Sequence, residues 1–480
     1  MNNKQTSRRD FLKQCALAHG ACYTSGFSAL GGLSLTAQAQ AQSIIRPTEY
    51  RAMVCVYLTG GNDLNMLIPT DDTRYNQYAA IRGDLAIARE SNNVNDEVFL
   101  PISSNGINYG LHPACGIEDA NAGAGSGGFK KLYDDENLAF IANTGALIQP
   151  TTAAQFDSRE GNPIPVPPSL FNHLIQKDFV RTGKVVSSDG WAGRIADYYD
   201  GVNTISPLNL SFTGDNAWQR GVKTTAYGTR GSSVPTMQGF RETGGSNAEA
   251  IRRRALERVN QLDQTHTITR ELGRIVGESL ELSDFLRTSL ASADTTINTE
   301  FPNTTMGNRL LNVAKLIKAR NSLNMPQQTF YVDSPGWDMH DDLFLRHTAN
   351  LEELSAAMTA FYAATVEMGL QDNIITFTNG DFGRTLDPNS TGSDHAWGGS
   401  QIVMGGRVNG GQVYGDFPYM ADGNGETQFR EFRGTLVPSI STDQVSSTIA
   451  KWFGDFSDNT LEELFPNLHN FNDYDLGFIS

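Results

Sequence analysis

Cysteine is scarce in this chain of 480 residues, which contains four. Cys15 and Cys22 lie in an N-terminal segment that we expect to be removed, so Cys55 and Cys115 remain. Two cysteines are too few for the disulfide framework of a small secreted domain. Because Cys55 stands in an apolar run typical of a strand, we expect a buried free thiol there and no Cys55–Cys115 bridge.

Positive charge is also in short supply. Lys and Arg number 37 against 53 Asp and Glu, so the formal net charge is -16 at pH 7. Nucleic acids and anionic membrane surfaces attract proteins that carry basic patches. We therefore expect no nucleic-acid partner and no adsorption to an anionic membrane.

Long apolar runs are missing beyond residue 41. Residues 1–41 match a twin-arginine export signal: Ser7-Arg8-Arg9-Asp10-Phe11-Leu12-Lys13, then a weakly apolar run, then Ala37-Gln38-Ala39 or Ala39-Gln40-Ala41 for cleavage. The run contains His19 and several Gly and Ser, which makes it a poor membrane anchor. We expect the twin-arginine export machinery as a partner, no stable membrane span, and a mature protein that is periplasmic or secreted.

The pattern of apolar runs predicts an α/β fold over residues 42–480, built as a single domain on a large, mostly parallel sheet between helices. Five runs are typical of buried strands: Arg51–Leu58, Leu138–Ala142, Thr329–Val332, Ile374–Thr378 and Gln401–Met404. A helical pattern from Phe344 to Met368 separates two of them, which favours a parallel crossover. Helical patterns at 248–289 and 305–322 predict a mainly helical insertion at about 200–325.

Acidic and histidine side chains follow several of these strands. Asp63, Asp338 and Asp381 come shortly after the first, third and fourth runs, His340 is two residues beyond Asp338, and His395 precedes the last run. In open α/β sheets, ligands bind beyond the carboxyl ends of the strands. Carboxylates and imidazoles together suit Zn²⁺, Mn²⁺ or Fe, and Ca²⁺ less obviously. We therefore predict a site for one or two divalent ions, able to polarise a phosphoryl, sulfuryl or acyl oxygen and to activate water.

Each of these residues also has a structural interpretation. Asp63 is placed to cap a following helix, and a single histidine is often a hydrogen-bonded core residue. Arg384 can clamp an anion bidentately, or pair with Asp381 or Asp387. His173 is a further candidate, although packing at a helix start explains it equally well. We predict Arg384 and His173 as the catalytic residues.

Five motifs in order resemble the bacterial family called domain of unknown function 1501. They are Gly60-Gly-Asn-Asp63, Gly336-Trp-Asp-Met-His340, Asp381-Phe-Gly-Arg-Thr385, Asp394-His-Ala-Trp-Gly-Gly399 and Phe465-Pro-Asn467. This family is grouped with the alkaline phosphatase and sulfatase superfamily. The resemblance implies that fold, with Asp63, Asp338, His340, Asp381 and His395 as metal ligands. Two departures stand out: Phe382 follows Asp381 where many superfamily members have His, and family relatives often carry Glu in place of Asp381.

The nucleophile is missing from its usual position. Superfamily hydrolases attack with Ser, Thr or a modified Cys, and family members often have Ser-His where this chain has Asn172-His173. An amide cannot attack, so Thr144 or a water activated by the ion would have to substitute.

These features predict an exported, metal-dependent hydrolase acting on phosphate or sulfate esters. The alternative is a noncatalytic envelope or secreted protein that keeps the fold for binding or assembly. An iron site for oxygen chemistry, using two His and one carboxylate, is a third and less attractive interpretation.

Overall fold

A computed structural model describes residues 49–480 except 91–97, 117–126, 159–163, 185–186, 200–207, 229–238, 241–245, 261, 263–265, 293–294, 323–324 and 422–426. The described residues all belong to one compact unit, Pro47–Ser480. The predicted export signal, residues 1–41, lies outside them. In the described part of the chain, no helix is both long enough and apolar enough to cross a membrane.

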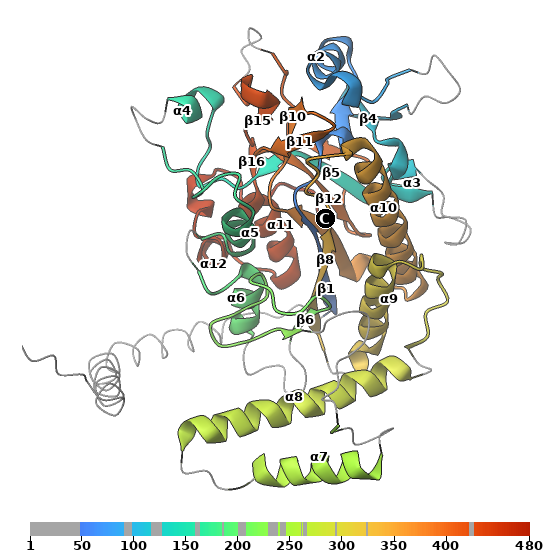
Figure 1. Cartoon of the computed structure of the whole chain (residues 1–480), viewed down its shortest axis with the longest axis vertical. Coiled ribbons are helices and arrows are strands. Elements are labelled where there is room, and N and C mark those ends of the chain that lie inside the picture. Colours follow the sequence, from blue (N-terminus) through green and yellow to red (C-terminus); the bar gives the residue numbers. More distant parts are fainter. Residues whose placement is uncertain are drawn as a thin grey trace, which may run out of the picture. The chain divides into compact units, whose positions relative to one another are not determined.

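A mixed, mostly parallel sheet forms the centre of this unit (Figure 1). Among the described residues it has nine strands, in the order β13-β5-β12-β9-β1-β8-β6-β7, with β16 also paired to β5. The strands are β1 (Arg51–Thr59), β5 (Leu138–Gly145), β6 (Asn209–Ser211), β7 (Tyr227–Gly228), β8 (Gln327–Pro335), β9 (Ile374–Gly380), β12 (Gly399–Met404), β13 (Val413–Tyr414) and β16 (Ile440–Ser441). All five predicted strands are present.

Strand β1 lies at the middle of the sheet, parallel to β8 on one side and to β9 on the other. Its side chains alternate between the two faces, as the pleat of a strand requires. Val54 and Val56 enter the main core cluster, whereas Tyr57 packs on the opposite face against Tyr331. Strand β12 is the exception to the parallel arrangement, because it runs antiparallel to both β5 and β9.

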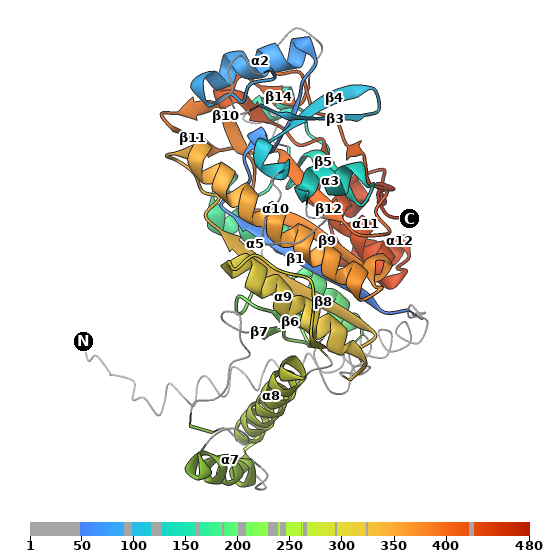
Figure 2. The same ribbon diagram turned by 90° about the vertical axis from the view of Figure 1, so that its right-hand side faces the viewer.

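Helices cover both faces of the sheet. Helices α9 (Thr305–Lys318) and α10 (Leu343–Glu367) lie on one face, as Figures 1 and 2 show together. The other face carries α5 (His173–Thr182), α6 (Trp191–Tyr198), α11 (Thr442–Gly454) and α12 (Asp458–Leu464). There, the Trp191 ring packs against Phe377 of β9 and Phe465 beyond α12. The fold class predicted from the sequence is therefore confirmed.

The predicted insertion at about 200–325 is helical but not separate from the sheet. It contains α7 (Asn247–Asn260), α8 (Thr267–Ala291) and α9, yet its first part also supplies β6 and β7. Strand β6 pairs with β8 from Asn209 to Ser211, so the segment extends the central sheet before it turns helical. Where the insertion begins and ends stays a prediction.

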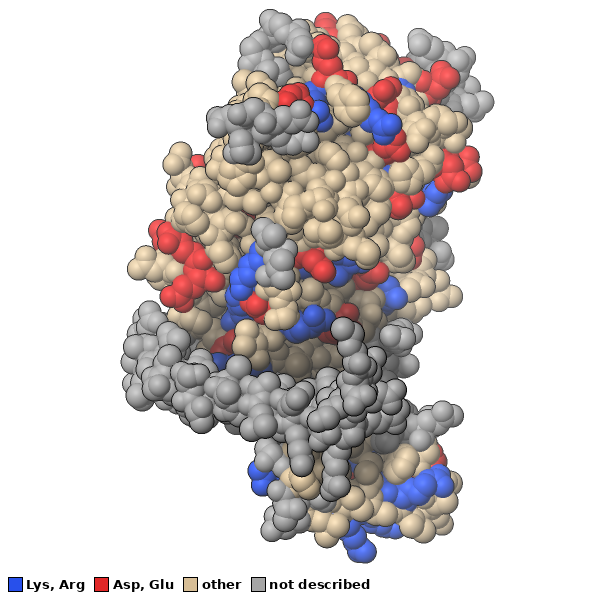
Figure 3. Space-filling model, turned by 60° about the vertical axis from the view of Figure 1, so that its left-hand side comes forward, with Lys and Arg blue, Asp and Glu red and all other residues tan. Residues whose placement is uncertain are grey.

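Smaller elements frame the strand ends. They are α2 (Asp72–Arg82), α3 (Gly128–Asp134), α4 (Ala153–Asp157), the three-stranded sheet β2 (Leu67–Pro69), β3 (Leu100–Ser104) and β4 (Ile107–Leu111), and the pairs β10 (Arg384–Asn389) with β11 (Gly392–His395) and β14 (Phe429–Arg430) with β15 (Thr435–Leu436). Cys55 and Cys115 are both buried and free, as expected. On the face drawn in Figure 3, basic and acidic side chains are interspersed.

Candidate metal centre

The site lies beyond the carboxyl ends of β1, β8 and β9. Asp338 and His340 follow β8, Asp381 follows β9, and His395 ends β11. The turn after β1 has to pass close to the β8 loop, and Gly60 makes this possible: a Cβ there would lie 2.1 Å from the Asp338 amide nitrogen. Gly60 also has a φ of 118°, which disfavours any residue with a side chain.

Helix α5 brings a further residue to this edge. Asn172 caps the helix, its side chain accepting hydrogen bonds from the Leu174 and Ile175 amides, and His173 is the first helical residue. The turn before the helix contains two residues with positive φ, Ser169 at 47° and Phe171 at 71°. Such backbone strain gathers at functional sites, where the surrounding structure imposes it.

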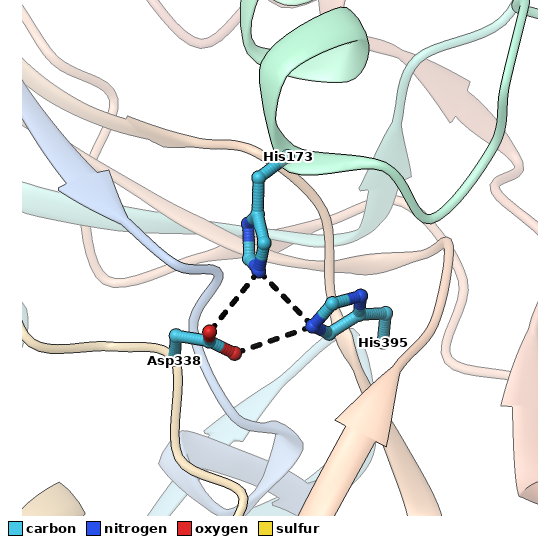
Figure 4. A group of neighbouring side chains, drawn as sticks. All are labelled: His173, Asp338 and His395. Atoms are coloured by element: carbon cyan, nitrogen blue, oxygen red, sulfur yellow. Dashed lines mark hydrogen bonds and ion pairs between the residues drawn. The ribbon is translucent and has the colours of Figure 1, made fainter.

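Four side chains point toward one another: His173, Asp338, His340 and His395, called here the His–Asp cluster. Figure 4 shows three of them. Nε2 of His395 lies 3.0 Å from Nε2 of both His173 and His340. The Asp338 carboxylate lies 3.3 Å from His173 Nε2, 3.0 Å from His340 Nε2 and 3.2 Å from His395 Nε2.

The other nitrogen of each ring already has an acceptor. Nδ1 of His395 is 2.8 Å from the Phe171 carbonyl oxygen, that of His173 is 2.8 Å from Asp381, and that of His340 is 3.1 Å from Asp394. A carbonyl or an ionised carboxylate only accepts, so each Nδ1 carries the hydrogen. In a neutral ring, Nε2 then presents its lone pair to the cluster.

Lone pairs and a carboxylate this close repel one another unless a metal ion lies between them or one ring takes up a proton, and the hydrogen bond to Asp381 raises the pKa of His173. The same pattern, an imidazole whose second nitrogen donates to a carboxylate or carbonyl, holds metal-ligating histidines in proteins. Burial lowers the pKa of His395, which favours the neutral form a ligand needs. His173, Asp338 and His395 each offer one ligand atom, and these atoms lie within 4.8 Å of one another. Two imidazole nitrogens and a carboxylate suit Zn²⁺, and also Mn²⁺ or Fe, whereas Ca²⁺ prefers a shell of oxygens. The residues present therefore fit a single transition-type ion.

Asp381 contacts the cluster through Nδ1 of His173. Its side chain is buried and accepts from Tyr57 Oη at 2.8 Å, from the Gly60 amide at 3.1 Å and from His173 at 2.8 Å. Donors therefore occupy both carboxylate oxygens. The Phe382 ring, next in sequence, packs against the rings of His173 and His395 with centroids 4.6 and 4.7 Å away.

A comparison with family models matches residues 50–455 to the family described as "Protein of unknown function (DUF1501)". The chain belongs to the DUF1501 family. No curated protein matches it.

Among solved structures, this DUF1501 chain is similar to one titled "Crystal structure of Ps i-CgsB", with 8% identity, a TM-score of 0.36, and coverage of 88% of this chain and 77% of that one. It is also similar to the PsFucS1 sulfatase from Pseudoalteromonas sp., with 11% identity, a TM-score of 0.25, and coverage of 82% and 67%. Likenesses this weak decide neither fold nor activity.

Not all of the predicted ligands join the His–Asp cluster. Asp338, His340 and His395 do. His173, predicted as catalytic, lies with them. Asp381 holds the ring of His173 and makes no ion pair with another member of the cluster.

Asp63 belongs to a different interaction. It caps the short helix η1 (Leu64–Met66) through the Asn65 amide, the structural interpretation made from the sequence, and it pairs with Arg82 at 2.6 Å. Both side chains of the pair are fully buried. Burial opposes ionisation of Asp63, but Arg82, His347 and the Asn65 amide together lower its pKa. This carboxylate is already neutralised by a guanidinium.

Arg384 differs from both sequence-based interpretations. It pairs with Asp338 at 2.7 Å, and also donates to the carbonyl oxygens of Gly60 and Ser393. The side chain is completely buried, so it fixes a carboxylate of the cluster rather than facing a substrate. Burial opposes ionisation of Asp338, yet Arg384 holds its pKa down to about 2, which keeps the carboxylate charged at neutral pH.

No hydroxyl or thiol among the described residues hydrogen-bonds to the side chains of the His–Asp cluster. Asn172 is occupied as the cap of α5. Thr144 is 4% exposed and lines a small buried cavity of about 30 Å³ together with Asp381. The sequence pointed to His173 as a catalytic residue, but its position at a helix start did not distinguish a metal ligand from a packed histidine.

Proposed function

We propose that this DUF1501 protein is an exported hydrolase of phosphate or sulfate esters that depends on one divalent transition-type ion. His173, His340, His395 and Asp338 would hold the ion. The observation that carries the proposal is the convergence of three imidazole nitrogens on one carboxylate, with every opposite ring nitrogen committed to an acceptor.

A bound ion at this position would supply Lewis acidity and lower the pKa of water. The residues of the chain prepare that chemistry. Asp381 fixes the orientation of His173, the Phe171 carbonyl fixes His395, and Arg384 holds Asp338 in its charged form. Phe382 lies against two of the rings and reduces their freedom.

One ion is favoured over two. In a site for two ions, Asp63 would be needed as a carboxylate ligand, but its charge is matched by the buried guanidinium of Arg82. Arg384 places a second fixed cation next to Asp338. The guanidinium groups of Arg82 and Arg384 therefore balance the charges of Asp63 and Asp338, which a second ion would otherwise have to balance.

A noncatalytic binding protein is the second candidate. The observation that favours it is that no Ser, Thr or Cys side chain hydrogen-bonds to the His–Asp cluster in the described part of the chain. In that case the ion would be structural or would bind a ligand without turnover.

The first experiment is elemental analysis of the natively exported protein and its Asp338→Ala variant. We expect about one equivalent of Zn, Mn or Fe in the wild type and a loss of at least tenfold in the variant, because a charged ligand is removed. Asp458→Ala is the matched control, since Asp458 is an exposed carboxylate at the start of α12 that pairs with Lys451. A folded wild type that stays metal-free after Zn²⁺ and Mn²⁺ are supplied contradicts the site.

Activity separates the two candidates. The loaded protein should hydrolyse 4-nitrophenyl phosphate or 4-nitrophenyl sulfate, lose this activity on chelation, and regain it on metal addition. A protein that holds one ion but turns over neither type of ester is the binding protein.

A further inference from the structure

Helix α5 carries three functional side chains on one face. His173, Lys177 and Arg181 are spaced by four residues, so they lie above one another along the helix. The first is a member of the His–Asp cluster, and the other two are cations. Their surroundings differ in depth: Arg181 is 8% exposed, whereas Lys177 is only half-buried and open to a ligand.

Neither cation forms an ion pair with a carboxylate of the described residues. Lys177 Nζ donates to Thr59 Oγ1 at 3.3 Å and lies 5.5 Å from the centre of the Tyr57 ring. Arg181 lies over the rings of Tyr57 and Tyr331 and donates to the Tyr331 hydroxyl. Burial and the neighbouring Arg181 lower the pKa of Lys177, against the opposing attraction of Asp333, Asp381 and Asp178.

The position of Lys177 connects it to the cluster. Its acceptor Thr59 precedes Gly60, whose amide donates to Asp381, and the Tyr57 ring beneath Nζ donates its hydroxyl to the same carboxylate. Lys177 is therefore one helical turn from His173. It also contacts residues that surround Asp381, the carboxylate that orients His173.

Three of the carboxylates around the cluster are paired with guanidinium groups. Asp338 pairs with Arg384, Asp394 with Arg433, and Asp341 with Arg346. Asp381 is satisfied by three hydrogen-bond donors. With a divalent ion bound, the uncompensated charge at this rim is positive, although the chain as a whole is strongly acidic. A local positive field of this kind attracts anions.

We propose that Lys177 binds the anionic group of the substrate beside the His–Asp cluster and makes the site selective for charged esters. The chemical class is an oxyanion ester, a sulfate or phosphate monoester, in preference to a neutral carboxylic ester. This inference rests on the proposed function, and it names a residue for recognition of the substrate.

The test compares Lys177→Met with the wild type, both loaded with Zn²⁺, using calorimetric titration with inorganic phosphate and with inorganic sulfate. We expect binding of at least one anion to weaken roughly tenfold or more, because a charged hydrogen bond is lost. KM for the matching 4-nitrophenyl ester should rise by a similar factor. Lys177→Arg should restore much of the affinity, which a purely structural role for the side chain would not predict.

Lys131→Met is the matched control, because Lys131 is paired with Asp135 on the surface. Metal content is measured in every variant and should not change. If Lys177→Met fails to fold, Lys177→Gln replaces it, since the amide can still donate to Thr59. Equal anion affinity in wild type and variant overturns the inference, and so does a wild type that binds neither anion.

The outcome is distinguishable from failure of the proposed function. Phosphate or sulfate binding that depends on Lys177, without turnover of any ester, supports the anion site and removes the hydrolase. Metal-dependent turnover with an anion affinity that does not depend on Lys177 supports the hydrolase and removes the anion site at Lys177.

Discussion

At the scale of single residues, the chemistry of the candidate site depends on hydrogen bonds to the far side of each imidazole. Asp381 is the most informative example. It follows a strand, as a ligand would, and only its neighbours show a different role. Tyr57, Gly60 and His173 direct three donors at its two oxygens. A carboxylate so occupied sets the orientation and basicity of its histidine.

Replacing Asp381 with Asn should therefore weaken metal binding without abolishing it. We expect the dissociation constant for Zn²⁺ to rise roughly 10- to 100-fold, the range seen when an outer partner of a ligating histidine is removed. Competition with a chromophoric chelator measures this change. Tyr57→Phe is the milder comparison, since the carboxylate stays and one of its three donors is lost. An unchanged constant in Asp381→Asn would mean that His173 is not a ligand.

At the scale of the elements, helix starts position functional and buried charged side chains, as strand ends do. Helix α5 places His173 and Lys177, and helix α11 buries an acid in its first turn. Asp443 of α11 is 2% exposed, accepts from the Asn467 side-chain amide and lies beside Gly183 at the end of α5. Such burial disfavours a charge, even at a helix N-terminus.

The pH dependence of stability should show this cost. Burial raises the pKa of Asp443 from 3.8 to about 6, against the opposing effects of Asn467 and Arg194. The pKa of Asp443 is higher in the folded than in the unfolded state, so its ionisation destabilises the fold. This destabilisation is small below about pH 4, grows between the two pKa values, and reaches its full size above about pH 6. The difference corresponds to about 3 kcal/mol at most.

Asp443→Asn should remove this cost while keeping an oxygen for Asn467. We expect the free energy of unfolding to increase by up to about 3 kcal/mol at pH 8 and by about half as much at pH 5. Urea unfolding at the two pH values provides the measurement, with exposed Asp458→Asn as the control. A variant that is less stable than wild type at pH 8 would show that the charge is compensated.

At the scale of the whole molecule, the chain is strongly acidic, and its N-terminal segment is expected to direct it out of the cytoplasm. The localisation is a proposal that depends on Arg8 and Arg9, which twin-arginine export requires as a pair. Replacing both with Lys should leave the unprocessed protein in the cytoplasmic fraction, whereas wild type should be found outside it and begin near residue 40 or 42. Fractionation with N-terminal sequencing tests this, and processing of the double variant at the wild-type level would contradict it.

The sequence by itself predicted five strands of the central sheet, the helical stretches that contain α7, α8, α9 and α10, and three members of the cluster. Apolar runs such as Arg51–Leu58 report burial directly, and the carboxyl ends of parallel strands share one edge of a sheet, so Asp338 and His340 could be placed there. His395 precedes β12 and reaches the same edge because β12 runs antiparallel to its neighbours. The same reasoning placed Asp63 and Asp381 with them, because position along a strand says where a carboxylate lies but not which group faces it.

Only the tertiary structure decided the roles. His173 is 222 residues from His395 in sequence, and its Nε2 reaches the cluster because the strained turn at Phe171 sets the start of α5. Arg82 reaches Asp63 from α2, and three donors from β1, the turn after it and α5 meet at Asp381. Metal binding, ion pairing and hydrogen bonding act over about 3 Å in space, and sequence separation does not encode such distances.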